Sequence, residues 1–365
     1  MEPIRVLQMI GSLNIGGSQA MIVNLYRAID RSQIQFDFII DRPGELYYGD
    51  ELKALGARIY ELPTFRGYNI HDVIKAWNVF LKGHPEYKVL HSHVRSYASI
   101  YLPIASKYGL KTIIHSHATT SGSGFLSIVK TILQYPLRYQ ADYFIGCSQL
   151  AGEWLFGERV VRSDRYFMLN NGVDLKDFEF DLKKRQAVRS EFGIGEEIVF
   201  GHVGRFHEAK NHKFLLELFG GINEQMQNTK LIIAGDGDLR SSIERKIQTL
   251  GLSDSVILAG NRSDVPELMM AFDCFLFPSL WEGLPVAVVE AQASGLPCFV
   301  SDTITKEVSI SELVRYLPID KGIDVWHDAL CNHTFKRKDV SVSIKKAGFD
   351  VSTTANWLMC FYLKL

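Results

Sequence analysis

Two carboxylates in one short stretch could bind a polar substrate. Glu282 and Glu290 lie within residues 277–291, FPSLWEGLPVAVVEA. Glu282 lies where an apolar run gives way to a loop, and Gly283 lets a ligand approach the backbone closely. Glu290 lies in an apolar helical run and needs hydrogen-bond donors to offset its desolvation, and ribose hydroxyls are suitable donors. The alternatives are a salt bridge for Glu290 and an acceptor role at the helix start for Glu282.

A basic loop could bind a diphosphate. Arg205 and Lys210 lie five residues apart in GRFHEAKN, directly after an apolar run. A guanidinium can grip phosphate oxygens in bidentate fashion, while an ammonium supplies a compact point charge. Because a helix dipole opposes positive charge at the start of a helix, we favour a bound phosphate over a solvated basic pair.

Two His-Ser-His triplets each come after a short apolar run. They contain His91 and His93, and His115 and His117. Alternate residues of an extended chain share one face, so a metal site is one interpretation. No carboxylate accompanies them, however, and imidazoles at strand ends also bond sugars, phosphates or backbone carbonyls. We favour substrate contact, with a structural role and a metal site as the alternatives.

A glycine-rich loop follows the first apolar run of the chain. Residues 11–18 read GSLNIGGS and include Gly16 and Gly17. Backbone N–H groups at a helix start attract phosphate. The spacing matches neither GxGxxG nor the Walker A loop, so a tight strand-to-helix turn is an equal alternative.

Short apolar runs alternate with helical patterns and must position these residues. Such alternation predicts parallel strands joined by helical crossovers, hence an α/β fold of two doubly wound, Rossmann-like domains. Ligands then bind beyond the carboxyl ends of the strands, in a cleft where the domains face each other. The predicted strands are 4–10, 36–40, 57–62, 89–90, 112–114, 143–147, 198–203, 230–234, 255–258, 274–277 and 298–300.

The pattern restarts after a turn and a charged stretch. We therefore expect an N-terminal Rossmann-like domain over residues 1–175 and a C-terminal Rossmann-like domain over 195–340. The last segment, 341–365, ends in a predicted helix over 353–365 and is a candidate to return to the N-terminal domain.

The composition excludes several classes of protein. The 365 residues carry a formal charge of −1, which disfavours a general nucleic-acid binder. No apolar run reaches the length of a membrane span, and no basic n-region precedes the first apolar run. Five cysteines without a CxxC motif favour a reduced, cytoplasmic protein.

The motifs together resemble the retaining nucleotide-sugar glycosyltransferases with the GT-B fold that form family four. The stretch from Glu282 to Glu290 resembles the E-x7-E signature of that family. The resemblance runs from residue 4 to about 310 and fades after about 320. The other matching segments are Gly16-Gly17, Asn171-Gly172-Val173-Asp174, Gly204-Arg205…Lys210-Asn211, Ala234-Gly235-Asp236-Gly237 and Asp273…Pro278-Ser279.

The resemblance implies that the N-terminal domain, 1–175, lies on the acceptor side and that the C-terminal domain, 195–340, binds the nucleotide-sugar. It also implies how a donor is held. Arg205 and Lys210 would neutralise the diphosphate and stabilise the leaving nucleotide. Glu290 would bind the ribose hydroxyls. Gly16 and Gly17 would offer backbone N–H groups to the diphosphate from the opposite domain.

The resemblance also implies how the sugar is oriented. Glu282, with the backbone of Gly283 and Leu284, would orient it. His115 occupies the place of the active-site histidine, and His117 competes for that assignment because the His-Ser-His repeat leaves the register open.

No cofactor and no metal are expected, since the fold uses cationic side chains in place of a divalent ion. Asp236 and Asp238 look like a metal-binding DxD pair but fit the GDG turn. Arg262 is a further candidate donor contact. We take UDP as the working base, from its frequency in the family.

The implied reaction is retaining transfer of a sugar to a saccharide or lipid-linked acceptor, in extracellular or capsular polysaccharide assembly. Residues 125–139, FLSIVKTILQYPLRY, could lie on the inner face of an anionic membrane. A core helix interrupted by Pro136 is the alternative that we prefer.

Three other functions compete with this one. A nucleotide-sugar epimerase of the same fold would need no acceptor. A metallohydrolase using the two His-Ser-His triplets would lose activity to a chelator. A non-catalytic sugar-nucleotide-binding module would bind without turnover, although the set of Glu282, Arg205 and Lys210 argues against it.

Overall fold

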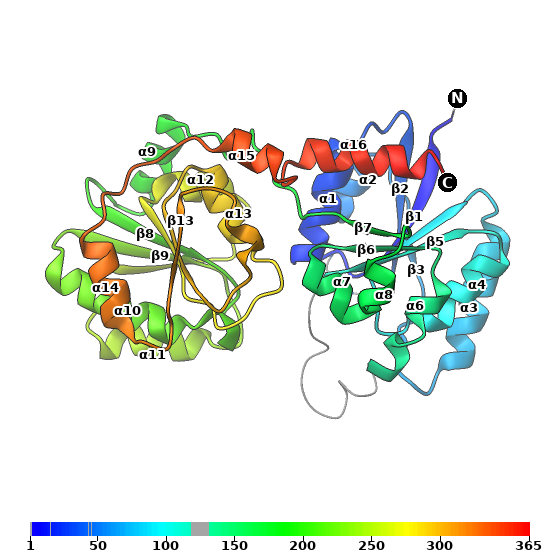
Figure 1. Cartoon of the computed structure of the whole chain (residues 1–365), viewed down its shortest axis with the longest axis horizontal. Helices are drawn as coiled ribbons and strands as arrows, with labels where there is room; N and C mark the ends of the chain where they lie inside the picture. Colours follow the sequence, from blue (N-terminus) through cyan, green and yellow to red (C-terminus); the bar gives the residue numbers. More distant parts are fainter. Residues whose placement is uncertain (1, 15, 43, 45, 118–130) are drawn as a thin grey trace. The chain divides into compact units, whose positions relative to one another are not determined.

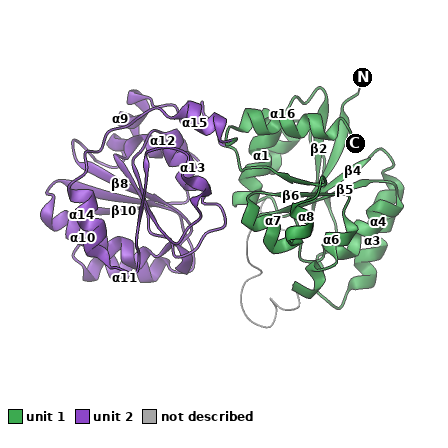
Figure 2. Cartoon of the chain, viewed as in Figure 1, with its two compact units in different colours: residues 1–172, 348–365 green, residues 173–347 purple. Residues whose placement is uncertain are grey.

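The computed structural model describes residues 2–14, 16–42, 44, 46–117 and 131–365. The chain forms two compact units (Figures 1 and 2). The first unit contains residues 1–172 and 348–365, and the second contains residues 173–347. Within the described residues, no helix has the length and apolar character needed to span a membrane.

The first unit is built on a seven-stranded parallel sheet with the order β3-β2-β1-β4-β5-β6-β7. Val6 on the central strand pairs with Phe36 on one side and Val89 on the other. The strands are β1 (Ile4–Gly11), β2 (Ile34–Ile40), β3 (Ile59–Glu61), β4 (Val89–Ser92), β5 (Lys111–Ser116), β6 (Tyr143–Gly146) and β7 (Tyr166–Met168).

Helices cover both faces of this sheet, so two apolar cores form. Val6 belongs to the core under α1 and α16, whereas its neighbour Leu7 belongs to the core under α3, α4 and α7, because successive strand residues point to opposite faces. The helices are α1 (Gly17–Ala28), α2 (Gly49–Ala54), α3 (Ile70–Gly83), α4 (Ala98–Lys107), α6 (Leu137–Gln140), α7 (Gln149–Phe156), α8 (Glu158–Val161) and α16 (Val351–Tyr362).

The second unit has a six-stranded parallel sheet with the order β10-β9-β8-β11-β12-β13. Its strands are β8 (Ile198–Val203), β9 (Thr229–Ala234), β10 (Val256–Gly260), β11 (Cys274–Phe277), β12 (Cys298–Ser301) and β13 (Val314–Leu317). Its helices are α9 (Leu182–Glu191), α10 (His212–Gln225), α11 (Arg240–Thr249), α12 (Val265–Ala271), α13 (Val286–Ala293), α14 (Ile323–Cys331) and α15 (Ser341–Lys346).

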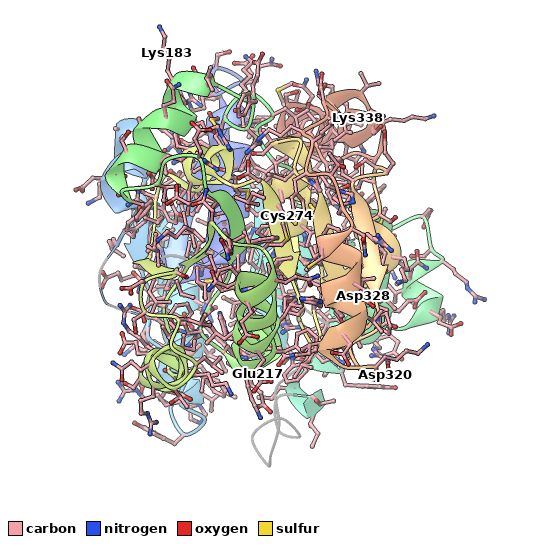
Figure 3. The ribbon with its side chains drawn as sticks, turned by 90° about the vertical axis from the view of Figure 1, so that its left-hand side faces the viewer. Lys183, Glu217, Cys274, Asp320, Asp328 and Lys338 are labelled. Carbon is pink, nitrogen blue, oxygen red and sulfur yellow. The ribbon has the colours of Figure 1, made fainter. Side chains whose placement is uncertain are left out.

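The side chains of Lys183 and Lys338 project from the surface of the second unit (Figure 3). Cys274 lies inside the sheet and is fully buried, whereas Lys183 and Lys338 are exposed. Phe200 on β8 pairs with Leu231 on β9 and Cys274 on β11. Strands buried on both faces read as continuous apolar runs, and this explains why their positions were predicted from the sequence.

The structure contains two strands that the sequence did not predict. β7 and β13 are the last strands of their sheets, and most of their residues are partly exposed. Arg315 interrupts the apolar run of β13, and β7 is only three residues long and directly follows the charged stretch 162–165. β4 and β5 also extend further than predicted, so His91 and His115 lie inside strands rather than after them.

The chain passes from the first unit to the second at Gly172 and returns at Gly348. Residues 341–347, including α15, group with the second unit, so the returning segment is shorter than the 341–365 that we expected. α9 also groups with the second unit. Arg185 and Arg189 on this helix each donate to Asp273, at 2.7 and 2.6 Å.

Helix α16 completes the core of the first unit. Val351, Ala355, Leu358 and Tyr362 are buried in the same apolar cluster as the inner face of α1. The Asp350 side chain caps the helix by accepting from the Thr353 N–H at 3.2 Å. An apolar face at helical spacing therefore explains why the chain end returns to this unit.

Gly172 accounts for one motif of the resemblance. A Cβ atom at this position would lie 2.8 Å from the Val351 Cα and 2.9 Å from the Thr354 Oγ1. The turn that leaves the first unit thus packs directly against the first residues of α16, and only glycine leaves room for this contact.

The predicted membrane-facing segment is only partly described. Residues 125–130 lie outside the described residues. Beyond them the chain is helical at 131–134 and again in α6, with Pro136 between the two turns. Ile132, Tyr135 and Tyr139 are exposed, and Leu137 is buried.

Candidate functional site

Each sheet has one place where the strand order reverses. In the first unit it lies between β1 and β4, and in the second between β8 and β11. The loops after two such strands run to opposite faces of the sheet, and the crevice between them is where ligands bind in α/β folds. Most predicted site residues lie on the loops or strand ends at these points. Glu290 instead lies on the helix after the β11 loop, and His115 and His117 lie on the neighbouring strand β5 and just beyond it. Arg262 lies away from both points.

In the second unit, Lys210 and Glu282 meet across the crevice. The Lys210 Nζ donates to the Glu282 Oε1 at 2.7 Å, and both side chains are mostly buried. The Lys210 ammonium also lies 4.5 Å from the centre of the Phe277 ring. The Leu280 N–H donates to the Ala209 carbonyl at 2.8 Å and joins the two loops through the backbone.

Glycines pack the loops after β8 and β9 against each other. Gly235 has a φ of +137°, and a Cβ atom on it would lie 2.1 Å from the Gly204 carbonyl oxygen. The Phe206 N–H donates to the Asp236 carbonyl at 2.9 Å. A Cβ atom on Gly204 would lie 3.0 Å from the Lys210 Cε. The loop glycines therefore fix the course of the basic loop and the place of Lys210.

Arg205 is the exposed member of the basic pair. Its side chain is 69% exposed, and its nearest carboxylate is Asp238, at 3.6 Å. An ion pair this exposed is weak, so the guanidinium can leave it for a phosphate. Asp236 accepts from the Gly237 N–H at 2.8 Å and lies 3.3 Å from Arg240. These contacts tie Asp236 to its own turn.

Glu290 faces inward from α13, and its carboxyl is poorly solvated although the residue is not fully buried. Burial raises the pKa of Glu290 to about 7. Among the described residues, no side chain or N–H donates a hydrogen bond to its carboxyl. In the same part of the chain, the N–H groups of Gly283 and Leu284 also have no partner. These groups can bind hydroxyl or phosphate groups of a ligand.

Two histidines beneath the basic loop escaped the sequence analysis. His202 on β8 bonds the Leu276 carbonyl through Nδ1 at 2.8 Å, and His212 opens α10. Burial lowers the pKa of His202 well below the usual imidazole value and that of His212 to about 4. Both rings are therefore neutral near pH 7 and support the basic loop without adding charge. Their positions in the sequence, just before and just after the GR…KN loop, were the signal that could have identified them.

Arg262 is occupied elsewhere in the second unit. It forms two hydrogen bonds with Asp264, at 2.7 and 2.6 Å, and two with Glu191, at 2.6 and 3.1 Å. These carboxylates raise the pKa of Arg262 above its usual value. The structure thus gives Arg262 the geometry of a link between α9 and the start of α12.

In the first unit, Gly16 and Gly17 open α1. The first turn of this helix holds no acidic residue, and a Cβ atom on Gly17 would meet nothing within 4 Å. Beside the loop, the Asp41 Oδ2 accepts from the Tyr97 hydroxyl at 2.6 Å. Burial raises the pKa of Asp41. The start of α1 has the backbone donors and open space that an anion requires.

The four histidines of the two triplets form one cluster of stacked rings. The His91 and His93 ring centres lie 4.5 Å apart, and those of His115 and His117 lie 4.0 Å apart. The His93 Nδ1 lies 2.8 Å from the His117 Nε2. His115 is fully buried, and neither of its ring nitrogens has a partner among the described residues.

Two side chains that the sequence analysis missed hold this cluster. The Tyr362 hydroxyl lies 2.6 Å from the His91 Nδ1, and the Gln8 Oε1 lies 3.0 Å from the His93 Nε2. Burial lowers the pKa of His91 well below the usual value and that of His93 to about 3. All members therefore stay neutral, because burial lowers the pKa of His115 and His117 as well.

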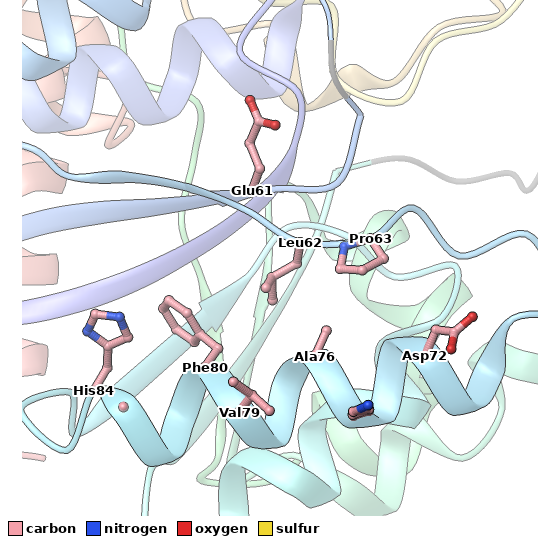
Figure 4. A pocket seen from close by; sticks show the side chains of 10 residues that line it. Glu61, Leu62, Pro63, Asp72, Ala76, Val79, Phe80 and His84 are labelled. Carbon is pink, nitrogen blue, oxygen red and sulfur yellow. The ribbon is translucent and has the colours of Figure 1, made fainter.

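The first unit also has an open cavity of about 680 Å³ between α3 and the segment after β3 (Figure 4). Leu62, Pro63, Val79 and Phe80 contribute most of its apolar lining. It contains none of the predicted site residues.

Comparison with known proteins decides the family. Residues 15–177 match the model of Glycosyltransferase Family 4, and residues 184–317 match that of Glycosyl transferases group 1. EpsF of Bacillus subtilis (strain 168), named as a glycosyltransferase, is 32% identical over 98% of this chain and 96% of its own length. The chain belongs to glycosyltransferase family 4. The family models and this relative thus confirm the resemblance that the motifs of the glycosyltransferase indicated.

Two further proteins extend the comparison. The UDP-Gal:α-D-GlcNAc-diphosphoundecaprenol α-1,3-galactosyltransferase of Escherichia coli is 26% identical over 79% of this glycosyltransferase and 76% of its own length. The crystal structure of Anabaena Alr3699/HepE in complex with UDP and glucose has a TM-score of 0.80 at 17% identity, over 99% of this chain and 100% of that one. The two parallel-sheet units of this glycosyltransferase are those of the GT-B fold, as predicted.

Proposed function

We propose that this glycosyltransferase moves a sugar from a UDP-sugar to a saccharide or lipid-linked acceptor in extracellular or capsular polysaccharide assembly. The pairing of Lys210 with Glu282 at 2.7 Å carries the proposal, since it joins a cation that would bind phosphate to a carboxylate that would orient the sugar, at the switch point of the second unit. The Escherichia coli relative, whose name states a UDP-sugar and a lipid-linked saccharide, supports the choice of substrates.

The donor would be held by charges and donors already in place. Lys210 and Arg205 would face the diphosphate and stabilise the negative charge that grows on it as the sugar leaves. Glu290 would accept hydrogen bonds from the ribose hydroxyls, which favour its ionised form. The free N–H groups of Gly283 and Leu284 would bind the sugar end of the donor.

The reaction would need no metal and would retain the anomeric configuration. Two cationic side chains serve the diphosphate, and Asp236 of the acidic pair is held within its own turn by the Gly237 N–H and Arg240. The reaction needs no general base beside Glu282. A front-face attack, in which the leaving phosphate takes the proton of the acceptor, requires no such base.

A thermal-shift panel tests the donor site. The full-length protein is melted with UDP, GDP, ADP, CMP and dTDP, each with EDTA and with Mg²⁺. Ligand bound to the native state raises the melting temperature according to its concentration over Kd. We expect UDP to raise it equally with EDTA and Mg²⁺, and Arg205→Ala to lose most of the shift. The proposal fails if no nucleotide changes the melting curve, or if the UDP shift requires Mg²⁺.

The stereochemical part has its own test. The product formed from a UDP-sugar of known α configuration is analysed by NMR at its new anomeric centre. An α product supports retention, and a β product excludes it.

A further inference from the structure

We propose that the histidine cluster of the first unit binds a borderline divalent transition metal ion, with Zn²⁺ as the reference ion. One ring nitrogen each of His91, His93 and His115 lies within 4.8 Å of the others. Three imidazoles with one open position form a common protein site for zinc. This site lies beyond the proposed transfer reaction, which uses no metal.

The distances are close to those that a metal requires. Zinc–nitrogen bonds of about 2.0–2.1 Å in a tetrahedron place the nitrogens roughly 3.3 Å apart. The three nitrogens therefore need to approach by up to about 1.5 Å, and rotation of the rings provides this. The His117 Nε2 lies 2.8 Å from the His93 Nδ1, at hydrogen-bond distance, so this contact must open for the His93 Nδ1 to bind a metal.

The outer contacts of the cluster match those of metal-binding histidines. A ligating imidazole usually donates its other N–H to an oxygen, which fixes the tautomer and the ring orientation. The His93 Nε2 faces the Gln8 Oε1 at 3.0 Å, which leaves Nδ1 toward the cluster. The His91 Nδ1 faces the Tyr362 hydroxyl at 2.6 Å, which leaves Nε2 free. Gln8 also donates to the same Tyr362 oxygen, at 3.2 Å.

Unpartnered nitrogens are the second observation that points to a ligand. The His91 Nε2 and both nitrogens of His115 are buried without a hydrogen-bond partner among the described residues. Buried polar atoms in native proteins are rarely left unpaired, because each costs about 1–3 kcal/mol. A cation accepts the free lone pairs of His91 and His115 at once.

The consequence for the transferase is inhibition by zinc. This part rests on the proposed function and on the family resemblance, which puts His115 in the place of the active-site histidine near the sugar. A ring nitrogen that ligates a cation cannot also bond a hydroxyl group. Binding itself is measured without any substrate, so a failure of the metal site and a failure of the proposed reaction are told apart.

Zinc binding is tested on the untagged, full-length protein after chelator treatment and removal of the chelator. Isothermal titration with Zn²⁺ is expected to give one tight equivalent, and titration with Mg²⁺ none, since Mg²⁺ prefers oxygen ligands. Co²⁺ is expected to give the intense visible bands of a tetrahedral site. His115→Gln should lower the Zn²⁺ affinity by more than the roughly 10–100-fold of an outer-shell loss.

Two variants complete the test. His71 is exposed on α3, so His71→Gln should bind Zn²⁺ as the wild type does. Tyr362→Phe should lower the affinity by about 10–100-fold through the orientation of His91. Melting without metal shows that each variant is folded, and His93→Gln replaces any variant that is not. Equal affinity in the wild type and His115→Gln, or no tight equivalent in the wild type, overturns the proposal.

Discussion

The hydroxyl of Tyr362, in the last turn of α16, lies 2.6 Å from the Nδ1 of His91 on β4. The end of the chain thus reaches the carboxyl edge of the first sheet. Gln8 on β1 donates to the same oxygen at 3.2 Å, and all three side chains are buried. A residue of the final helix therefore helps to position the histidine cluster.

Tyr362→Phe should destabilise the first unit. Loss of the hydroxyl leaves the His91 Nδ1 and the Gln8 Nε2 buried without this partner, at a cost of about 1–3 kcal/mol. Urea unfolding measures the change in the free energy of unfolding. Leu363→Ala is the control, because that side chain is 43% exposed and should change stability by less than about 0.5 kcal/mol. Equal stabilities of Tyr362→Phe and the wild type would contradict the role of this bond.

Lys210→Ala should weaken donor binding more than any change to a neighbouring lysine. A hydrogen bond to a charged group contributes about 1.5–3 kcal/mol, so we expect UDP to bind about 10–150-fold more weakly. Calorimetry measures the affinity. Lys213→Ala is the matched control, since Lys213 is exposed one turn further on in α10. Similar losses in both variants would show that general charge, and not the position beside Glu282, binds the nucleotide.

Gly235→Ala should disrupt the packing of the loop after β8 against the loop after β9. The added Cβ atom would lie 2.1 Å from the Gly204 carbonyl oxygen, at a φ of +137° that side chains rarely adopt. Both atoms belong to backbone, so rotation of a side chain cannot relieve the contact. We expect a loss of more than about 3 kcal/mol in stability, beyond the roughly 1–3 kcal/mol of backbone strain alone.

Gly251→Ala is the control that separates backbone strain from the contact with the Gly204 carbonyl. Gly251 also has a positive φ, of +68°, but a Cβ atom on it would meet nothing within 4 Å. This variant should show the cost of a left-handed backbone without a close contact, measured by the same urea unfolding. If both variants lose the same stability, the contact between Gly235 and Gly204 is not what requires glycine.

Donor affinity should depend on pH through Glu290. Its pKa is about 7 in the free protein, and ribose hydroxyls favour the ionised carboxylate. Below pH 7 a proton must leave on binding, so affinity should rise with pH and level off above about 7. UDP-glucose is the suitable ligand, since it lacks the terminal phosphate that titrates near pH 6. Calorimetry should show a flat profile for Glu290→Gln, and an unchanged slope would contradict the assignment.

Without ligand, the same group gives stability the opposite dependence. With a pKa of about 7, the folded protein holds the Glu290 proton up to that pH, whereas the unfolded chain releases it near the ordinary glutamate pKa of 4.5. The free energy of unfolding should therefore fall as pH rises through this interval. Glu290→Gln should lack this part of the slope in urea unfolding at pH 5, 6, 7 and 8.

Much of the fold could be predicted because its central strands are buried on both faces. β8 and β11 were predicted with their observed bounds, since continuous apolar runs mark such strands. β7 was missed because it is only three residues long and follows the charged stretch 162–165, and β13 because Arg315 interrupts its apolar run. The positions of Lys210 and Glu282 followed from the rule that ligands bind after parallel strands, but their contact across 72 positions did not.

The sequence by itself determined the motifs, the two-domain α/β organisation and the family, because local patterns of apolar and chemically distinctive residues carry that information. Only the tertiary structure decided which of these residues meet. In the folded chain Arg262 bonds Glu191 and Asp264, whereas Arg205 is exposed. Gln8, His91 and Tyr362, from β1, β4 and α16, form hydrogen bonds with one another through the Tyr362 hydroxyl. Such contacts depend on sheet order and on the return of the last helix, and no local pattern of residues specifies either.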